Sequence, residues 1–434
     1  MASFGALGDR RFRRLLAGEG LSSFGDSALY LTLGIWAKTL TGSNSAAGGV
    51  FLALTAPILF APLAGHLADR VRRKPLLIAV NCATALVVLS LLAVRSRDQL
   101  WLIYVVAFWY GGSFNVINAA GAGLRKDMLP GEDLASANAA LQTASQGLRV
   151  LSPLVGAAIF GAFGGAWVAV LDAVTFAAAI AALVSIKVVE SASAPATEKG
   201  AFWRDTMAGF RYIRRVPLLL QIAAVGAAAY SVVGIEETTI YAVVGQGLHR
   251  PPTFVGVAMS VQGAGAIISG LTGALLLRLV GPARMTGLAL ACFAIGATAY
   301  LTVSLPLVLA GAVLDGLGIV WLVISAGTAT QLYTPPELQG RVATAATQLF
   351  LAPQTISIAA GAALISVVSY RLLLLVVAVV IAVCAIIILV RPACAPADEP
   401  DVEKVSLNLC PTSCSAGRLP SSEGPFRRAI PQQG

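Results

Sequence analysis

Long uncharged runs are the feature of this 434-residue chain that most limits its fold. Residues 46–64 and 75–94 contain no charged side chain, and similar runs recur as far as residue 391. Because an α-helix rises about 1.5 Å per residue, a run of roughly 20 apolar residues crosses the ~30 Å hydrocarbon core of a bilayer. Charged residues make up only 12% of the chain, about half their share in soluble proteins. The pattern predicts an all-α polytopic membrane protein.

Twelve apolar runs are long enough to be transmembrane helices. We expect them near residues 15–38, 46–69, 75–94, 99–122, 135–161, 166–187, 217–244, 252–277, 284–303, 306–329, 341–364 and 369–391. A polar segment separates the sixth run from the seventh. The expected domains are therefore a tail (1–14), a six-helix half (15–187), a linker (188–216), a second six-helix half (217–391) and a disordered tail (392–434).

The positive charges indicate the orientation of these helices. If both termini lie in the cytoplasm, 24 lysines and arginines fall on the cytoplasmic side and five on the other. Cytoplasmic loops of membrane proteins carry an excess of these residues. The sequence therefore predicts cytoplasmic N and C termini. The net charge of +9 is explained by these loops, so we expect no nucleic-acid partner.

The linker contains a basic amphipathic segment. Trp203, Met207, Phe210 and Ile213 recur three or four residues apart, with arginines between them. This spacing predicts a helix that lies along the cytoplasmic surface of the membrane. It is either a plain connector or a lipid sensor.

Several classes of protein are disfavoured by missing signals. The sequence has no phosphate-binding loop of the G-x4-G-K-[ST] type and no soluble domain large enough for an enzyme. Cys410 and Cys414 lie in the last tail without a histidine nearby. We therefore expect no catalytic residues, cofactor or metal site, and a monomer that works with the bilayer.

The two halves repeat each other at an offset of about 204 to 208 residues. Gly65–Arg73, between the second and third runs, matches a weaker copy at Gly273–Arg284. The segment that begins at Pro130 matches the one at Pro335. Two six-helix halves joined by a polar linker are typical of secondary transporters, in which the substrate binds between the halves near the membrane midplane.

The loop Gly65-His-Leu-Ala-Asp-Arg-Val-Arg-Arg-Lys74 resembles the signature loop of the major facilitator superfamily, G-x-L-a-D-R-x-G-R-[RK]. Arg72 stands where that pattern has its second glycine, as in the drug-proton antiporter branch that includes macrolide exporters. Leu21–Asp26, Leu171–Phe176 and Glu337–Val342 also resemble that branch. The resemblance covers residues 10–391 and implies that the loop is a cytoplasmic gate, with Gly65, Asp69, Arg70 and Arg73 as its working residues.

Ionisable groups within the apolar runs are candidates for proton coupling, because a charge in hydrocarbon is costly. Asp26 and Arg149 both fall near the middle of their runs. The resemblance places these two helices side by side, so we expect the pair to meet, as a structural ion pair or as a proton-linked switch. Arg149 pairing with Asp172 is the competing arrangement.

The second half has its own intramembrane acids. Glu236 and Glu237 point about 100° apart on one helix, so at most one faces a central cavity. Asp315 lies near the centre of the tenth run. We include these three acids among the proton-coupling candidates. Neutral polar groups on the fourth and fifth runs either orient a substrate or link helices, namely Asn115, Asn118, Gln142 and Gln146.

These observations favour a multi-pass transporter of the bacterial inner membrane. The expected function is proton-coupled efflux of hydrophobic, in part cationic, small molecules. The alternatives are a lysophospholipid or siderophore exporter of the same fold, and a membrane sensor that no longer transports.

Overall fold

The computed structural model describes residues 5–188, 190, 201–335 and 338–391. Thirteen α-helices make up this part of the chain: α1 Arg10–Thr41, α2 Asn44–Thr55, α3 Ala61–Arg70, α4 Arg73–Leu89, α5 Leu100–Met128, α6 Gly131–Phe163, α7 Gly165–Ser185, α8 Ala201–Arg215, α9 Pro217–Ala242, α10 Val255–Ala299, α11 Leu305–Leu332, α12 Gln339–Leu364 and α13 Tyr370–Val390. The tail 392–434 lies outside the described residues.

Helix boundaries follow local chemistry. The Asp9 carboxylate accepts a hydrogen bond from the backbone N–H of Arg11 at 2.6 Å and so caps the start of α1. Gly42, with a φ of 70°, ends that helix in the left-handed conformation that glycine adopts without strain. The Ser43 hydroxyl then caps α2 by accepting from Ala46 N–H at 3.3 Å.

The division of the apolar runs into helices differs from the expected one at two places. The second apolar run is broken into α2, a short 3-10 helix at Ala56–Phe60, and α3, in a stretch that contains Pro57 and Pro62. The eighth and ninth runs are joined in α10, which turns at Gly281, where φ is 76°. Seven of the described helical stretches are long and apolar enough to cross a membrane.

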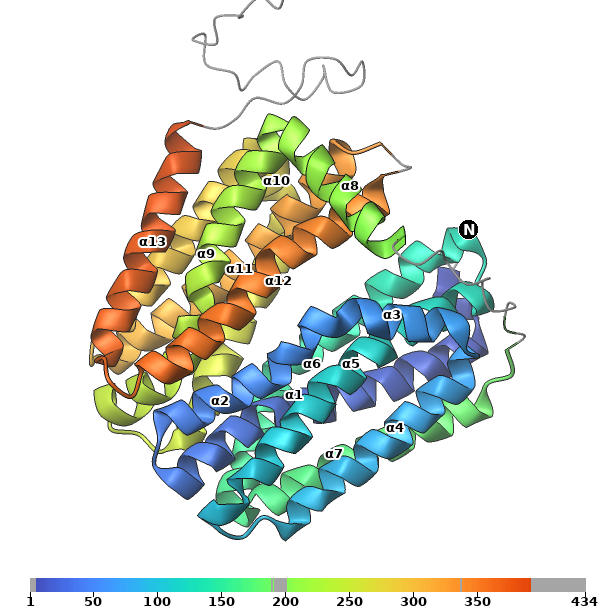
Figure 1. The fold of residues 1–434 in the computed structure, drawn as a ribbon, viewed down its shortest axis with the longest axis horizontal. Helices are drawn as coiled ribbons and strands as arrows, with labels where there is room; N and C mark the ends of the chain where they lie inside the picture. Colours follow the sequence, from blue (N-terminus) through green and yellow to red (C-terminus); the bar gives the residue numbers. More distant parts are fainter. Residues whose placement is uncertain (1–4, 189, 191–200, 336–337, 392–434) are drawn as a thin grey trace, which may run out of the picture. The chain divides into compact units, whose positions relative to one another are not determined.

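Helices α1–α7 form one group and α9–α13 another (Figure 1). We call these groups the N-half and the C-half. The two ends of the bundle can be told apart by their contacts. At one end, the linker side, Arg14 reaches the Ser185 carbonyl and Tyr212 of α8 reaches the Tyr333 carbonyl. At the other end, the far side, Gly165 lies against the ring of Trp36.

The halves contact each other at the far side, through α2 with α9 and α12 and through α6 with α10. The Ser45 hydroxyl donates to the Ala362 carbonyl at 2.5 Å, and Tyr241 OH donates to the Leu31 carbonyl at 3.4 Å. Gly48 packs so closely that an added Cβ would lie 3.0 Å from Cβ of Ala362. The two halves are therefore packed together at the far side.

Candidate functional site

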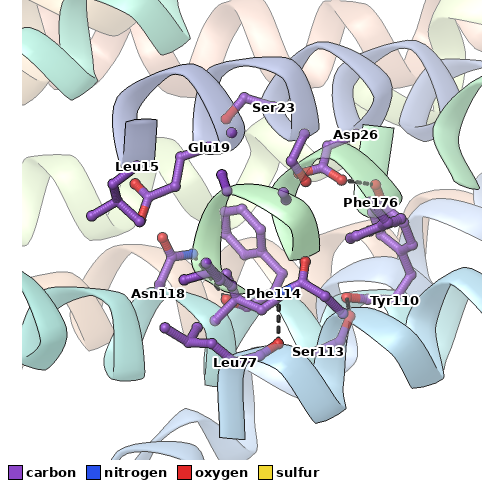
Figure 2. A pocket seen from close by; sticks show the side chains of 17 residues that line it. Leu15, Glu19, Ser23, Asp26, Leu77, Tyr110, Ser113, Phe114, Asn118 and Phe176 are labelled. Carbon is purple, nitrogen blue, oxygen red and sulfur yellow. Dashed lines mark hydrogen bonds between the residues drawn. The ribbon is translucent and has the colours of Figure 1, made fainter. Parts of the chain in front are cut away.

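A cavity of about 90 Å³ lies inside the N-half, between α1, α4, α5 and α7 (Figure 2). Leu15 and Glu19 line it nearer the linker side, and Asp26 lines it about two helical turns further along α1. Its polar lining residues are Glu19, Ser22, Ser23, Asp26, Asn81, Tyr110, Ser113 and Asn118. A hollow with so many polar groups inside a helical bundle suits water or a small polar ligand.

Asp26 is held by an aromatic hydroxyl. Tyr110 of α5 donates a hydrogen bond from its hydroxyl to Oδ1 of Asp26. The Tyr110 ring stands edge-on to Phe176 of α7, with 6.2 Å between the ring centroids. Asp26 was expected from its position in an apolar run, whereas Tyr110 gave no signal because a tyrosine is unremarkable there.

A second carboxyl group lies beside Asp26. Asp172 of α7 is completely buried, and neither of its carboxyl oxygens has a hydrogen-bond partner among the described residues. A Cβ added to Gly25 would lie 2.5 Å from Oδ1 of Asp172 and would overlap Oγ1 of Thr175. The missing side chain at residue 25 therefore lets Asp172 approach α1 next to Asp26, and the two carboxyl groups interact electrostatically.

Two neighbouring acids in a buried site cannot both be ionised at low cost, because like charges repel and low dielectric penalises each charge. The N-half thus provides a place where one proton can be held between two carboxyl groups, with a tyrosine donor on one of them. The expected ion pair of Arg149 with Asp26 or Asp172 is not tested, because the Arg149 side chain lies outside the described side chains. The same holds for Gln142 and Gln146.

Glu19 lies at the linker-side part of the cavity and has a basic partner. Arg125 of α5 approaches its carboxylate at 3.3 Å, and both side chains are partly exposed. This pair combines an acid with a cation where the cavity is nearest the linker side. It is suited to pass protons or to attract cations.

The two described asparagines of α5 hydrogen-bond within their own helix. Asn118 donates to the Phe114 carbonyl at 2.9 Å, and Asn115 donates to the Gly111 carbonyl at 3.1 Å. Asn118 also lines the cavity, whereas Asn115 is absent from its lining. Of the two, Asn118 has the geometry to contact a molecule there.

The C-half contains a second acidic cluster. Asp315 of α11 is completely buried and Glu236 of α9 is 7% exposed. Glu236 and Tyr300 lie close enough to Asp315 to interact with it electrostatically. Gly296 of α10 makes room for this cluster, because a Cβ there would overlap Oδ1 of Asp315. The sequence placed each acid in a separate run and did not predict that they meet.

Glu237 points to a different helix. Its Oε1 accepts a hydrogen bond from the side-chain amide of Gln354 on α12 at 2.8 Å. The adjacent acids Glu236 and Glu237 thus face α11 and α12 respectively, in keeping with the 100° between successive helical residues.

The sequence profile described as the Major Facilitator Superfamily matches residues 15–236 and 234–426. The chain belongs to this superfamily. Its relatives are membrane transporters rather than enzymes. The drug-proton antiporter branch is a finer assignment that this match does not distinguish.

A relative from Bacillus subtilis (strain 168), an uncharacterized MFS-type transporter YfiS, is 25% identical over 260 residues. The match covers 59% of this chain and 61% of that relative's length. The crystal structure of the nucleoside transporter NupG has a TM-score of 0.68 at 14% identity, and the likeness covers 88% of this chain and 99% of that one.

A bacterial homologue of the iron transporter ferroportin, in an inward-facing state, has a TM-score of 0.66 at 16% identity. That likeness covers 87% of this chain and 98% of the homologue. The two TM-scores show that the fold is shared, although the identities are low. They carry no information on the substrate of this chain.

The superfamily's signature loop is held on the linker side by acids of the N-half and the linker. Arg73 forms an ion pair with Asp127 of α5 and lies over Gly123, where an added Cβ would overlap Nε of Arg73. Glu190 accepts from the backbone N–H groups of Arg73 and Lys74, at 2.5 and 3.3 Å, at the start of α4. Neither acid was predicted as a partner of the loop.

The remaining gate residues are described only in part. Arg70 is exposed at the end of α3. Gly65 and Asp69 lie in the same helix, and the role expected for Asp69 in the gate is not tested, because its side chain is not among those described.

Proposed function

We propose that this chain is a proton-coupled exporter of hydrophobic small molecules that works by alternating access. The observation that carries the proposal is the carboxyl pair of Asp26 and Asp172, with Tyr110 as donor, in a polar cavity of the N-half. A carboxyl pair that holds one proton can exchange it when the site meets water, and so can couple transport to a pH gradient.

The proposed topology has twelve transmembrane helices with both termini in the cytoplasm of a bacterium and the chain in its inner membrane. The two parts of α10 on either side of Gly281 count as two of the twelve. The linker side is then cytoplasmic, because the arginines at the ends of α3, α5 and α8 lie there. The packing of the halves at the far side corresponds to a conformation closed toward the exterior.

In this scheme the halves rock about their interface and expose a midplane site to each side in turn. Asp26, Glu236, Glu237 and Asp315 are the proposed proton-coupling acids, with Arg149 as the cation opposite them. Asn118, with Asn115, Gln142 and Gln146, is the proposed polar lining for a substrate. Phe114 and Phe176 in the cavity wall favour an apolar substrate, and the acids favour one that carries a positive charge.

The signature loop is the proposed cytoplasmic gate. Arg73 is anchored by Asp127, and we propose that Asp69 and Arg70 on the preceding helix meet the C-half when the cytoplasmic side closes. Asp69→Asn should then weaken transport while leaving substrate binding in place.

Inverted membrane vesicles provide the test. Uptake of a panel of fluorescent cationic dyes, macrolides and labelled lysophospholipids is measured with and without an imposed pH gradient. We expect uptake of at least one compound to depend on the gradient and to disappear in Asp26→Asn, whereas Asp98→Asn, an exposed acid, serves as the matched control. Transport of lysophospholipid alone would favour a lipid exporter, and gradient-independent uptake of every transported compound would contradict the proton coupling.

A further inference from the structure

The acids of the C-half occupy helices that correspond to those of the N-half site. Asp26 and Tyr110 meet across α1 and α5, the first and fourth expected membrane helices. Glu236 and Asp315 meet across α9 and α11, the seventh and tenth. These are the corresponding helices of the two repeats, and the C-half has a second acid, Asp315, on the helix where the N-half has Tyr110.

Among the described residues, no cation acts on the C-half contact. Glu236 interacts with Asp315 and Glu237, and Asp315 with Glu236, Tyr300 and Cys292. The described cations of the neighbouring helices lie at helix ends or turns: Arg278 and Arg284 flank the turn of α10 at Gly281, Arg341 lies in the first turn of α12, and Arg371 stands beside Tyr370 at the start of α13. Within the part of the chain that the structure describes, the pair therefore has no salt bridge to neutralise it.

Both acids also lack hydrogen bonds at atoms that are sealed from solvent. The two carboxyl oxygens of Asp315 and Oε2 of Glu236 are buried without a partner among the described residues. Two adjacent carboxylates in this state would repel each other with no solvent to screen them. A single proton held between them removes one charge and supplies the missing hydrogen bond.

The same stretch of α9 joins the halves at the far side. Thr238 and Tyr241 follow Glu236 within about one and a half helical turns. Cγ2 of Thr238 lies 3.1 Å from a Cβ built on Gly48, and Tyr241 OH donates to the Leu31 carbonyl. Parting of the halves there moves the segment of α9 that carries Glu236.

We infer that Glu236 and Asp315 form a second proton-binding site, in which one proton is shared between the two carboxyl groups and exchanges when the far-side contact of the halves opens. This inference rests on the proposed alternating access. It adds to the Asp26 site a proton that is loaded from the far side, so that each half carries one proton through the transport cycle.

Infrared difference spectroscopy on the purified protein tests the shared proton without any substrate. The protonated-carboxyl stretching band of the wild type is compared with that of Glu236→Gln/Asp315→Asn. We expect the double variant to lose the band area of one carboxyl group, whereas Asp98→Asn, which changes an exposed acid outside the pair, leaves the band of the pair in place. Loss of no band area means that both acids are ionised, and loss of two groups means that both are protonated; either result overturns the inference.

A disulfide lock tests the link to the far side and keeps both acids native. A Cβ on Gly48 lies 3.0 Å from Cβ of Ala362, close to the separation of about 3.5–4.5 Å that a disulfide spans, so Gly48→Cys with Ala362→Cys should cross-link the halves. We expect exchange of the carboxyl band in D₂O to slow at least about tenfold on oxidation and to recover on reduction. Gly48→Cys alone, which cannot form the cross-link, should exchange at the same rate before and after oxidation. Equal exchange in the locked and reduced protein overturns the assignment of the site to the far-side gate.

The outcome of these two experiments does not depend on the outcome of the vesicle experiment that tests the proposed function. A chain that exports nothing along a pH gradient can still hold the shared proton. Conversely, proton-driven export can persist with a C-half pair that carries none.

Discussion

Tyr110 of α5 donates a hydrogen bond to Oδ1 of Asp26 on α1, at the cavity that Glu19 lines nearer the linker side. The hydroxyl favours the ionised form of Asp26, since a donor to a carboxylate stabilises its charge. Asp172 on the neighbouring helix has the opposite effect, because its charge repels that of Asp26. In the proposed function, the balance between these two contacts decides whether Asp26 is protonated.

Tyr110→Phe should therefore trap the proton. The variant removes a hydrogen bond to a charged group worth about 1.5 kcal/mol or more, which corresponds to roughly a tenfold shift toward protonated Asp26. We expect proton-driven export in inverted vesicles to fall about tenfold near neutral pH. Tyr104→Phe is the control. The Tyr104 hydroxyl donates to the Ala46 carbonyl at 3.2 Å, and Tyr104 does not line the cavity. Equal losses in the two variants would show that the hydroxyl of Tyr110 is not specific to the proton site.

Gly25→Ala should destabilise the N-half. The added methyl would overlap Oγ1 of Thr175 and lie 2.5 Å from Oδ1 of Asp172, so α1 and α7 must separate. Overpacking of this kind costs about 1–3 kcal/mol, which lowers the melting temperature of the purified protein by several degrees. Gly20→Ala in the same helix is the matched control, because its methyl meets only Leu148 at 3.8 Å. A melting temperature equal to that of Gly20→Ala would contradict the close approach of the two helices.

Substitutions of Arg73 and Asp127 should have non-additive effects on the stability of the protein. Their ion pair is largely buried, with 20% and 3% of the two side chains exposed. Once one partner is removed, the other loses the ion pair that offsets its burial, so the double variant Arg73→Ala/Asp127→Asn should be more stable than the sum of the single changes predicts. We expect a coupling energy of about 1 kcal/mol or more in a double-mutant cycle on chemical unfolding.

Arg72→Ala supplies the control for that cycle, because Arg72 is exposed one residue before the start of α4. Paired with Asp127→Asn, it should give effects that add. A coupling energy as large for Arg72 as for Arg73 would mean that Asp127 responds to the general positive charge of the loop.

Asp9 provides a pH-dependent contribution outside the membrane. Its hydrogen bond with Arg11 holds the pKa of the Asp9 carboxyl below its ordinary value. Since the folded pKa is lower than the unfolded one, the stabilisation is complete above about pH 4 and is lost as the pH falls through the folded pKa. Asp9→Ala should cost about 1 kcal/mol at pH 7 through the lost cap of α1, and less near pH 3. A stability difference that stays constant over this range would contradict the role of the ionised carboxylate.

The sequence predicted the superfamily and most helices correctly, because apolar runs, charged loops and the signature motif are local signals. It located Asp26, Glu236 and Asp315 as intramembrane acids for the same reason. It did not predict that Glu236 meets Asp315 or that Tyr110 holds Asp26. These contacts join residues about 80 positions apart, and they depend on the rotation of each helix about its axis, which tertiary packing determines.

The contact of Asp172 with Asp26 could also not be predicted from the sequence. The sequence offered Arg149 as a partner of Asp172, a pairing that stays a prediction, and did not indicate that Asp172 lies next to Asp26 through the space left by Gly25. A glycine before an acid is a weak signal in a membrane helix, where small residues are common. The functional meaning of Gly25 emerges only when α7 is packed against α1.

Counterflow in proteoliposomes measures whether Asp26 couples transport to protons. A compound identified in the export panel is loaded into proteoliposomes, and both its exchange and its uphill movement along an imposed pH gradient are recorded for wild type and Asp26→Asn. We predict that the variant keeps exchange, since its binding site and alternating access are intact, and loses uphill transport. Uphill transport by Asp26→Asn at the wild-type rate would contradict the account.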